Sequence, residues 1–172
     1  MRRASDLLGL PVFDSSRDCQ IGTVKEILVD LLRGRLVALL MPEKVWAEPG
    51  LIPVDYASSI GPDQVRLAEA GMVCRGEQGA KFRQGKLTLE QVRKLAIFTR
   101  SGSRLGNVED LILDDDRILA LELSDGLIQD VFQGRDTLAL PPEARLEEKS
   151  IIVPDNTQCN PQEQPLEGRR PH

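Results

Sequence analysis

The chain has 172 residues and a formal net charge of −5. This length suits one domain of ordinary size or two small ones. The acidic balance argues against a general nucleic-acid binder, and an aromatic content of 3% leaves few rings on which bases or sugars could stack.

The first third of the sequence predicts a series of short strands. Residues 1–9 are expected to form a helical turn capped by Ser5 or Asp6, followed by a strand at 10–13 with Pro11 at an edge or at the strand start. Residues 21–30 and 35–41 predict a hairpin that turns at Gly34. Shorter strands at 51–55 and 64–67 flank a helical turn at 56–60. Short strands separated by turns in this way favour a small barrel over a sandwich.

The same unit then begins again. Residues 68–87 form a connector rich in glycine and charge, and Thr88 to Gln91 can cap a second helical turn. The matching segments, in order, are 10–13 with 95–98, 21–24 with 105–108, 35–39 with 117–121, 52–55 with 140–143 and 64–67 with 150–153. This order indicates a duplication, with repeats at 1–67 and 88–153. Residues 154–172 are polar and rich in proline and predict a disordered tail.

The motifs of both repeats are similar to those of one known family. The first repeat carries Gly9-Leu10-Pro11-Val12, Ile21-Gly22-Thr23-Val24, Ile52-Pro53 and 61–67, and the second carries 102–111 and Leu140-Pro141. In this the chain resembles the PRC-barrel family, although Lys94 replaces the leading glycine of the second repeat. The resemblance implies an all-β protein of two tandem small barrels with short helical turns.

The resemblance also bears on function. The family includes the H subunit of photosynthetic reaction centres, the C-terminal domain of the small-subunit ribosome maturation factor and many bacterial and archaeal proteins. It has no common catalytic residues, and its members act as docking surfaces. We therefore expect a non-enzymatic adaptor that binds other proteins. The alternatives are a factor associated with the small ribosomal subunit and a subunit peripheral to a membrane or photosynthetic complex.

The residues that could carry catalysis or bind a metal give weak signals. The single histidine, His172, lies in the tail, so no imidazole is available to activate Cys19 as a nucleophile. Asp114-Asp115-Asp116 lies in a turn too short for a calcium loop of the EF-hand type. We expect no catalytic residue, metal or cofactor.

The cysteines and the apolar runs bear on location. Cys19, Cys74 and Cys159 are far apart and form no Cys-x-x-Cys pair, which fits reduced thiols in a cytoplasm. The longest apolar run, 36–41, is too short to cross a bilayer. We expect a cytoplasmic protein, and attachment to a membrane surface stays open.

Charge distribution gives the candidate binding residues. Between Arg75 and Arg104 there are eight basic residues against two acids, Glu77 and Glu90. The connector residues Arg75, Lys81, Arg83 and Lys86 could meet an acidic protein surface and, less favourably, RNA or anionic lipid. The alternative is a solvated, flexible linker. Trp46 is a second candidate contact, against the alternative that its ring caps one end of the barrel.

Three pairs of residues are expected to have structural roles at equivalent positions. Gly22 and Gly106 are predicted beside bulges. Ala38 and Ala120 are expected to be buried where strands approach closely. Pro53 and Pro141 are expected to match each other.

Overall fold

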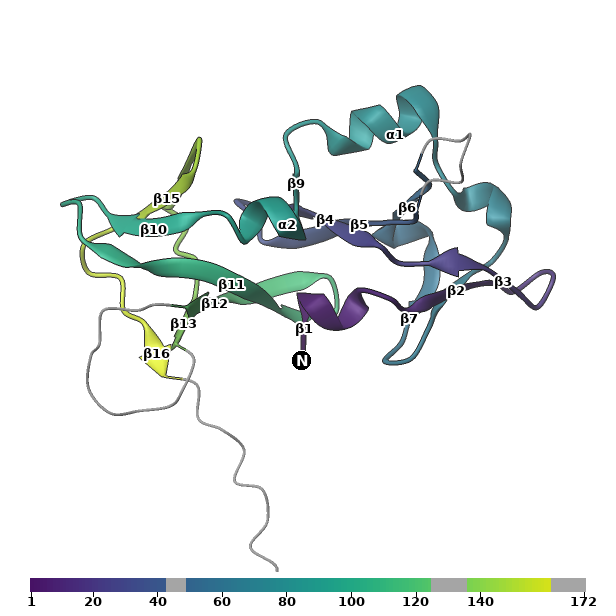
Figure 1. The fold of residues 1–172 in the computed structure, drawn as a ribbon, viewed down its shortest axis with the longest axis horizontal. Helices are drawn as coiled ribbons and strands as arrows, with labels where there is room; N and C mark the ends of the chain where they lie inside the picture. The colour runs from purple at the N-terminus through teal and green to yellow at the C-terminus, as the bar shows by residue number, and fades with distance from the viewer. Residues whose placement is uncertain (43–48, 125–135, 162–172) are drawn as a thin grey trace, which may run out of the picture.

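The computed structural model describes residues 1–42, 49–124 and 136–161, and shows two curled, barrel-like β-units (Figure 1). The first unit contains β2 (Pro11–Asp14), β3 (Cys19–Thr23), β4 (Glu26–Asp30), β5 (Arg35–Leu40), β6 (Leu51–Pro53), η2 (Val54–Tyr56), β7 (Ala57–Ile60) and β8 (Val65–Leu67). The second contains β10 (Ala96–Thr99), β11 (Arg104–Asp114), β12 (Arg117–Ser124), β13 (Asp136–Leu138), β14 (Arg145–Glu147) and β15 (Ser150–Val153).

Short elements precede and follow the two units. The leader of the first unit is β1 (Arg2–Arg3) with η1 (Ala4–Leu7), and the leader of the second is β9 (Leu87–Thr88) with α2 (Leu89–Val92). The connector holds η3 (Ala70–Met72) and α1 (Gly76–Arg83), and β16 (Asn160–Pro161) follows the second unit.

The strand ladders confirm that the two units repeat one pattern. Val12 pairs with Gly22 in the first unit and Ile97 with Gly106 in the second, and each ladder shifts register immediately afterwards. The last strand of each unit, β8 or β15, pairs in parallel with the first, β2 or β10. The β4–β5 and β11–β12 hairpins have the same register, with Glu26 equivalent to Asp110 and Ala38 equivalent to Ala120. The long strand β11 corresponds to β3 and β4 together, because the first unit breaks this strand between Thr23 and Glu26.

A local twofold axis relates the units where their sheets join. Arg35 of β5 pairs antiparallel with its own equivalent, Arg117 of β12. The Leu36 amide donates to the Asp116 carbonyl (2.7 Å), and the equivalent Ile118 amide donates to the Gly34 carbonyl (2.8 Å). Equivalent residues that face each other across an antiparallel ladder define a twofold relation between the strands that carry them.

The two leaders are exchanged between the units. Strand β1 pairs with β11, placing Arg3 opposite Ile112, and β9 pairs with β4, placing Thr88 opposite Leu28. Ile112 and Leu28 are equivalent, so each leader docks at the same place on the unit that it does not precede. In Figure 1 the purple N-terminal segment accordingly lies against the green β11 and β12.

One apolar core runs through both units. It includes Ala4 and Leu7 of η1 and Leu89 and Val92 of α2, together with the inward residues of the strands. A second, smaller cluster lies on the outer face of β4, β5 and β6, and Phe82 packs against it. Figure 1 shows α1, which carries Phe82, above these strands. Burial of apolar surface on both faces explains the nearly continuous apolar sequence of β5.

Several expectations from the sequence differ from the structure. The helical turn expected at 56–60 is strand β7 instead. The alternative of a solvated, flexible linker does not fit the connector, because Phe82 packs α1 against the outer cluster. Residues 154–161 do not form the expected disordered segment, because β16 pairs with β13 and Cys159 packs against the core. Pro141 is not equivalent to Pro53, because the ladders β5–β6 and β12–β13 make Ala139 the match of Pro53.

Candidate functional site

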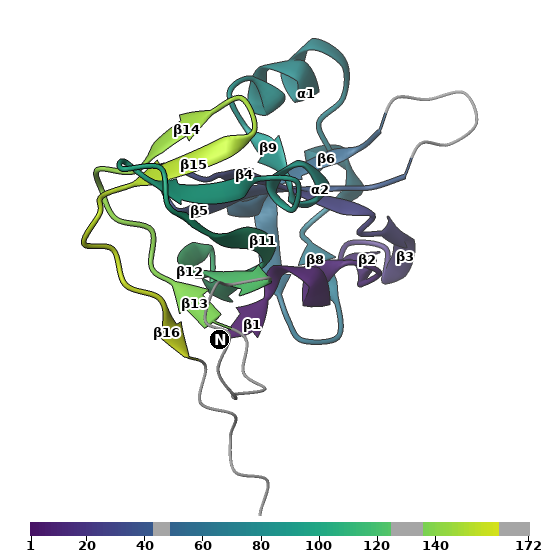
Figure 2. The same cartoon turned by 60° about the vertical axis from the view of Figure 1, so that its left-hand side comes forward.

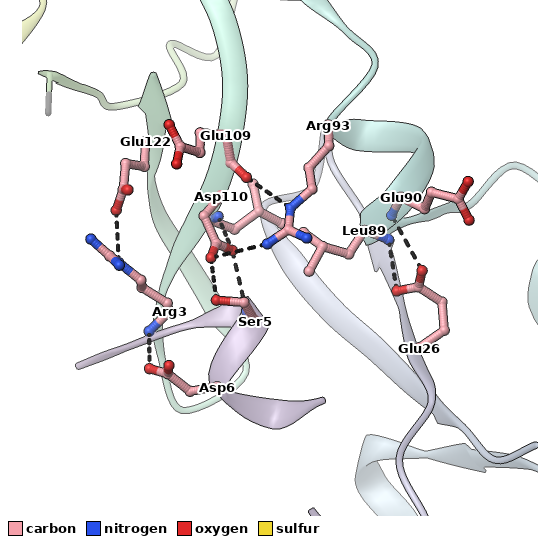
Figure 3. A network of polar contacts seen from close by, with 11 residues as sticks. Arg3, Ser5, Asp6, Glu26, Leu89, Glu90, Arg93, Glu109, Asp110 and Glu122 are labelled. Carbon is pink, nitrogen blue, oxygen red and sulfur yellow. Dashed lines mark hydrogen bonds and ion pairs between the residues drawn. The ribbon is translucent and has the colours of Figure 1, made fainter. Parts of the chain in front are cut away.

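The most elaborate polar network lies where the two units exchange their leaders (Figure 3). Asp110 of β11 is buried and accepts hydrogen bonds from the Ser5 amide (3.2 Å), the Ser5 hydroxyl and its neighbour, the Leu111 amide (2.8 Å). Arg93 adds an ion pair to Asp110 (3.4 Å) and donates to the Glu109 carbonyl (2.8 Å). One carboxylate therefore holds the leader of the first unit and is contacted by a residue just after the leader of the second.

The equivalent carboxylate, Glu26, makes the reciprocal contacts. It accepts from the Leu89 amide (3.2 Å) and the Glu90 amide (3.3 Å), which open α2, and from its neighbour Ile27 (2.8 Å). Amide groups in the first turn of a helix have no partner within the helix, so carboxylates stabilise them. Glu26 and Asp110 thus perform the same task for opposite leaders.

The leaders also cap themselves. The Thr88 amide donates to Gln91 (2.9 Å) and the Gln91 amide donates back to Thr88 (3.2 Å), as a capping box does. In the first leader the Arg3 amide donates to Asp6 (3.0 Å). Neither residue expected to cap 1–9 is the N-cap of η1, which is Arg3. Asp6 lies inside the turn and accepts from the Arg3 amide, whereas Ser5 binds the other unit.

The first leader ties the units together through two further arginine contacts. Arg3 forms an ion pair with the fully buried Glu122 (2.9 Å), visible at the left of Figure 3. Arg2 donates to the carbonyl groups of Ile60 (2.7 Å) and Gly61 (2.8 Å) at the end of β7. Consecutive arginines thus reach into different units.

The basic candidates of the connector lie on or beside α1. Arg75 is its N-cap residue, and Lys81 and Arg83 are in its last turn. All three are exposed, and none has an ion-pair partner in the described part of the chain. Lys86 differs, because it is partly buried and forms an ion pair with Asp30 (3.3 Å). The structure therefore separates three surface cations from one structural lysine.

The other predicted residues have mixed positions. Trp46 lies outside the described residues. Ala38 is fully buried, as expected, whereas Ala120 is only partly buried because no counterpart of α1 covers it among the described residues. Gly106 has a φ of +152°, which favours glycine, whereas Gly22 does not have a positive φ. A Cβ at Gly22 would instead lie 2.9 Å from the Met41 sulfur.

The groups considered for chemistry are dispersed. Cys19 is exposed at the start of β3, and Cys74 is buried, where desolvation raises the pKa of its thiol. Asp115 and Asp116 form the β11–β12 turn, where Asp116 pairs with Arg35 (2.9 Å). Within residues 1–42, 49–124 and 136–161, no three or more His, Cys, Asp or Glu side chains gather as metal ligands would. The helices of this part are all too short or too polar to span a membrane.

Comparison with known families fits the duplicated ladders. The PRC-barrel domain family matches the chain twice, at residues 1–70 and 85–158. The chain belongs to the PRC-barrel domain family. No curated protein matches it.

Each of the two family matches covers one leader and the unit that follows it. Each PRC-barrel repeat therefore includes the leader that docks on the other repeat. The helical turn expected at 1–9 does not indicate this exchange, since its sequence would look the same whichever barrel it contacted. A weak signal existed in the matched acids Glu26 and Asp110. Two equivalent carboxylates on mostly apolar strands need hydrogen-bond donors, either buried ones or the backbone amides at the start of a helix.

Proposed function

We propose that this tandem PRC-barrel protein is a non-enzymatic adaptor and that α1 forms its contact with an acidic segment of a partner protein. The observation that carries this proposal is the set of three exposed cations, Arg75, Lys81 and Arg83, that have no ion-pair partner among the described residues. Phe82 packs the same helix onto the outer face of β4–β6, so the cations are presented from a fixed position.

Several features support a protein partner over other ligands. The whole chain is acidic, so a small basic surface attracts an acidic segment without binding polyanions broadly. Three exposed charges on an eight-residue helix match a short stretch of Asp and Glu residues rather than the long phosphate track of a nucleic acid. Free cysteines throughout the described chain support a cytoplasmic location.

The test uses the full chain and a matched pair of variants. Replacing Arg75, Lys81 and Arg83 together by Ser should weaken capture of the partner about tenfold or more and reduce its salt dependence. As a control, Lys86→Ser also removes a positive charge from the connector, but this lysine is paired with Asp30. We expect Lys86→Ser to leave capture of the partner unchanged. The complex should survive nuclease treatment and remain in the soluble fraction.

Other outcomes distinguish the alternatives. Co-sedimentation with small ribosomal subunits that is lost after nuclease treatment would favour the ribosome-associated function. Binding to vesicles containing phosphatidylserine, released at high salt, would favour the membrane-peripheral function. An unchanged affinity in the triple variant would contradict α1 as the contact.

A further inference from the structure

Strand β14 is an edge strand whose outer side is open. It ends the larger sheet, and β15 is its only neighbour in the described residues. Arg145, Leu146 and Glu147 are all exposed, and the apolar side chain of Leu146 leaves about a third of its surface accessible to solvent. Figure 2 shows β14 beyond β15, on the side of β15 that faces away from β10. Open edges of this kind are prone to pair with another strand.

The backbone of Leu146 is oriented for such pairing. A two-residue loop joins β14 to β15, and Glu147 pairs with Ser150 next to this loop. In such a hairpin the pair beside the loop exchanges hydrogen bonds, so the next pair, Leu146 with Ile151, does not. The N–H and C=O groups of Leu146 therefore point away from β15, toward the open edge.

The sequence of β14 is complementary to itself. When Arg-Leu-Glu lies antiparallel to a second Arg-Leu-Glu centred on the leucine, each Arg145 faces the Glu147 of the other copy and Leu146 faces Leu146. Opposite charges directly across a ladder are stabilising, and like charges are destabilising. Neither Arg145 nor Glu147 has an ion-pair partner in the described chain that would compete.

Leucine at the centre extends the core across the contact. Leu146 lies opposite the fully buried Ile151, so both side chains are on the inner face of the sheet. A second Leu146 beside the first would cover the apolar surface that each copy leaves exposed. In such a contact the same residues of both copies face each other. Two copies therefore occupy the surface completely, and the product is a dimer.

We propose that two copies of the chain associate through β14, antiparallel about a twofold axis at Leu146, to form one continuous sheet. The interface is small, so association depends on protein concentration. This proposal is independent of the function assigned to α1, which lies in the connector after the first unit.

The equivalent edge in the first unit, β7, provides a comparison. Its sequence, Ala-Ser-Ser-Ile, has no charges that could pair. The carbonyl groups of its last residue, Ile60, and of the following Gly61 already accept hydrogen bonds from Arg2. Strand β14 has neither property. The repeat thus offers one edge suited to self-association and one that is not, and Ser59 of β7 is an exposed site for a control substitution.

Analytical ultracentrifugation of the full chain over a wide concentration range tests the proposal. The wild type should show a monomer–dimer equilibrium. Glu147→Arg places Arg opposite Arg, and Arg145→Glu places Glu opposite Glu, so each variant alone should dimerise at least about tenfold more weakly. The double variant Arg145→Glu/Glu147→Arg should restore dimerisation, and Ser59→Arg should leave it unchanged. Circular dichroism should show that all the variants are folded.

Mixing the two single variants gives the sharpest result. Each contact in the mixed pair joins Arg to Glu, so the mixture should form a heterodimer although neither variant dimerises well alone. A wild type that stays monomeric at every concentration would overturn the proposal. A dimer insensitive to both single substitutions would overturn it as well, because the copies would then meet elsewhere.

Discussion

Glu26 and Asp110 stand at the same position of two repeated strands, and each holds the backbone amide groups of the leader that belongs to the opposite unit. This relationship makes the tandem protein resemble a twofold dimer whose subunits have been joined by a connector. It also predicts that a substitution that destabilises one unit destabilises the other.

Removing the Asp110 carboxylate should destabilise the protein more than removing that of Glu26. Asp110 is buried, so Asp110→Ala leaves the Ser5 and Leu111 donors without an acceptor, and we expect a loss of about 2–3 kcal/mol in the free energy of unfolding. Glu26 is partly exposed, and Glu26→Ala should cost about 1 kcal/mol, as the loss of a helix cap does. Urea denaturation measures both values. Equal losses would contradict the assigned difference in burial.

The exchange of leaders predicts that neither half folds alone. A fragment of residues 1–84 lacks β9 and α2, and a fragment of residues 85–172 lacks β1 and η1. Each would leave core positions open, including those filled by Leu7 or Leu89. We expect each fragment alone to give poorly dispersed NMR spectra, and an equimolar mixture to give the spectrum of the folded protein. A folded, monomeric 1–84 fragment would show that the leaders are dispensable.

The two equivalent alanines should respond differently to enlargement. Ala38 is fully buried in the cluster beneath α1, so Ala38→Leu should overpack it and cost about 1–3 kcal/mol. Ala120 is partly exposed, and Ala120→Leu should stay within about 0.5 kcal/mol of the wild type. Thermal or urea unfolding of the two variants compares them directly. A larger loss of stability from Ala120→Leu than from Ala38→Leu would contradict the assigned difference in burial.

The two equivalent glycines should also differ. Gly106→Ala places a Cβ on a residue with a φ of +152° and should destabilise the protein by about 1 kcal/mol or more. Gly22→Ala meets only the flexible Met41 side chain, which can move aside, and should cost less. The difference in urea midpoint between the variants tests the order.

Asp14 should contribute to stability in a pH-dependent way. It is buried at the end of β2, and its hydrogen bonds from Ser16 lower its pKa below the ordinary value of 3.8. A carboxyl group with a lowered pKa in the folded state stabilises the protein above its unfolded pKa, and this contribution is lost as the pH falls through the folded value. Unfolding midpoints should therefore fall below about pH 4, and fall less steeply in Asp14→Asn. Parallel curves for the two proteins would exclude Asp14 as a source of the effect.

The sequence predicted the repeat and most of its strands because the alternation of apolar residues and the Gly22 and Gly106 motifs are local signals. It misplaced Pro141 because a Leu-Pro pair resembles Ile52-Pro53 whether or not the ladder aligns them. The sequence left a flexible linker open for the connector because Gly76 and Gly79 disfavour helices, while the packing of Phe82 against distant strands stabilises one. The exchange of leaders depends wholly on such distant contacts.

The exchanged leaders also constrain how the chain folds during its synthesis. Ser5 is made before its acceptor, Asp110, which follows 105 residues later. Until then Ala4 and Leu7 have no complete core to enter, and the first unit itself waits for α2. Folding from the N-terminus, domain by domain, is the usual order on the ribosome. Here the first leader docks only after the second hairpin has emerged, so the growing chain keeps apolar surface exposed until then, and both barrels are completed together.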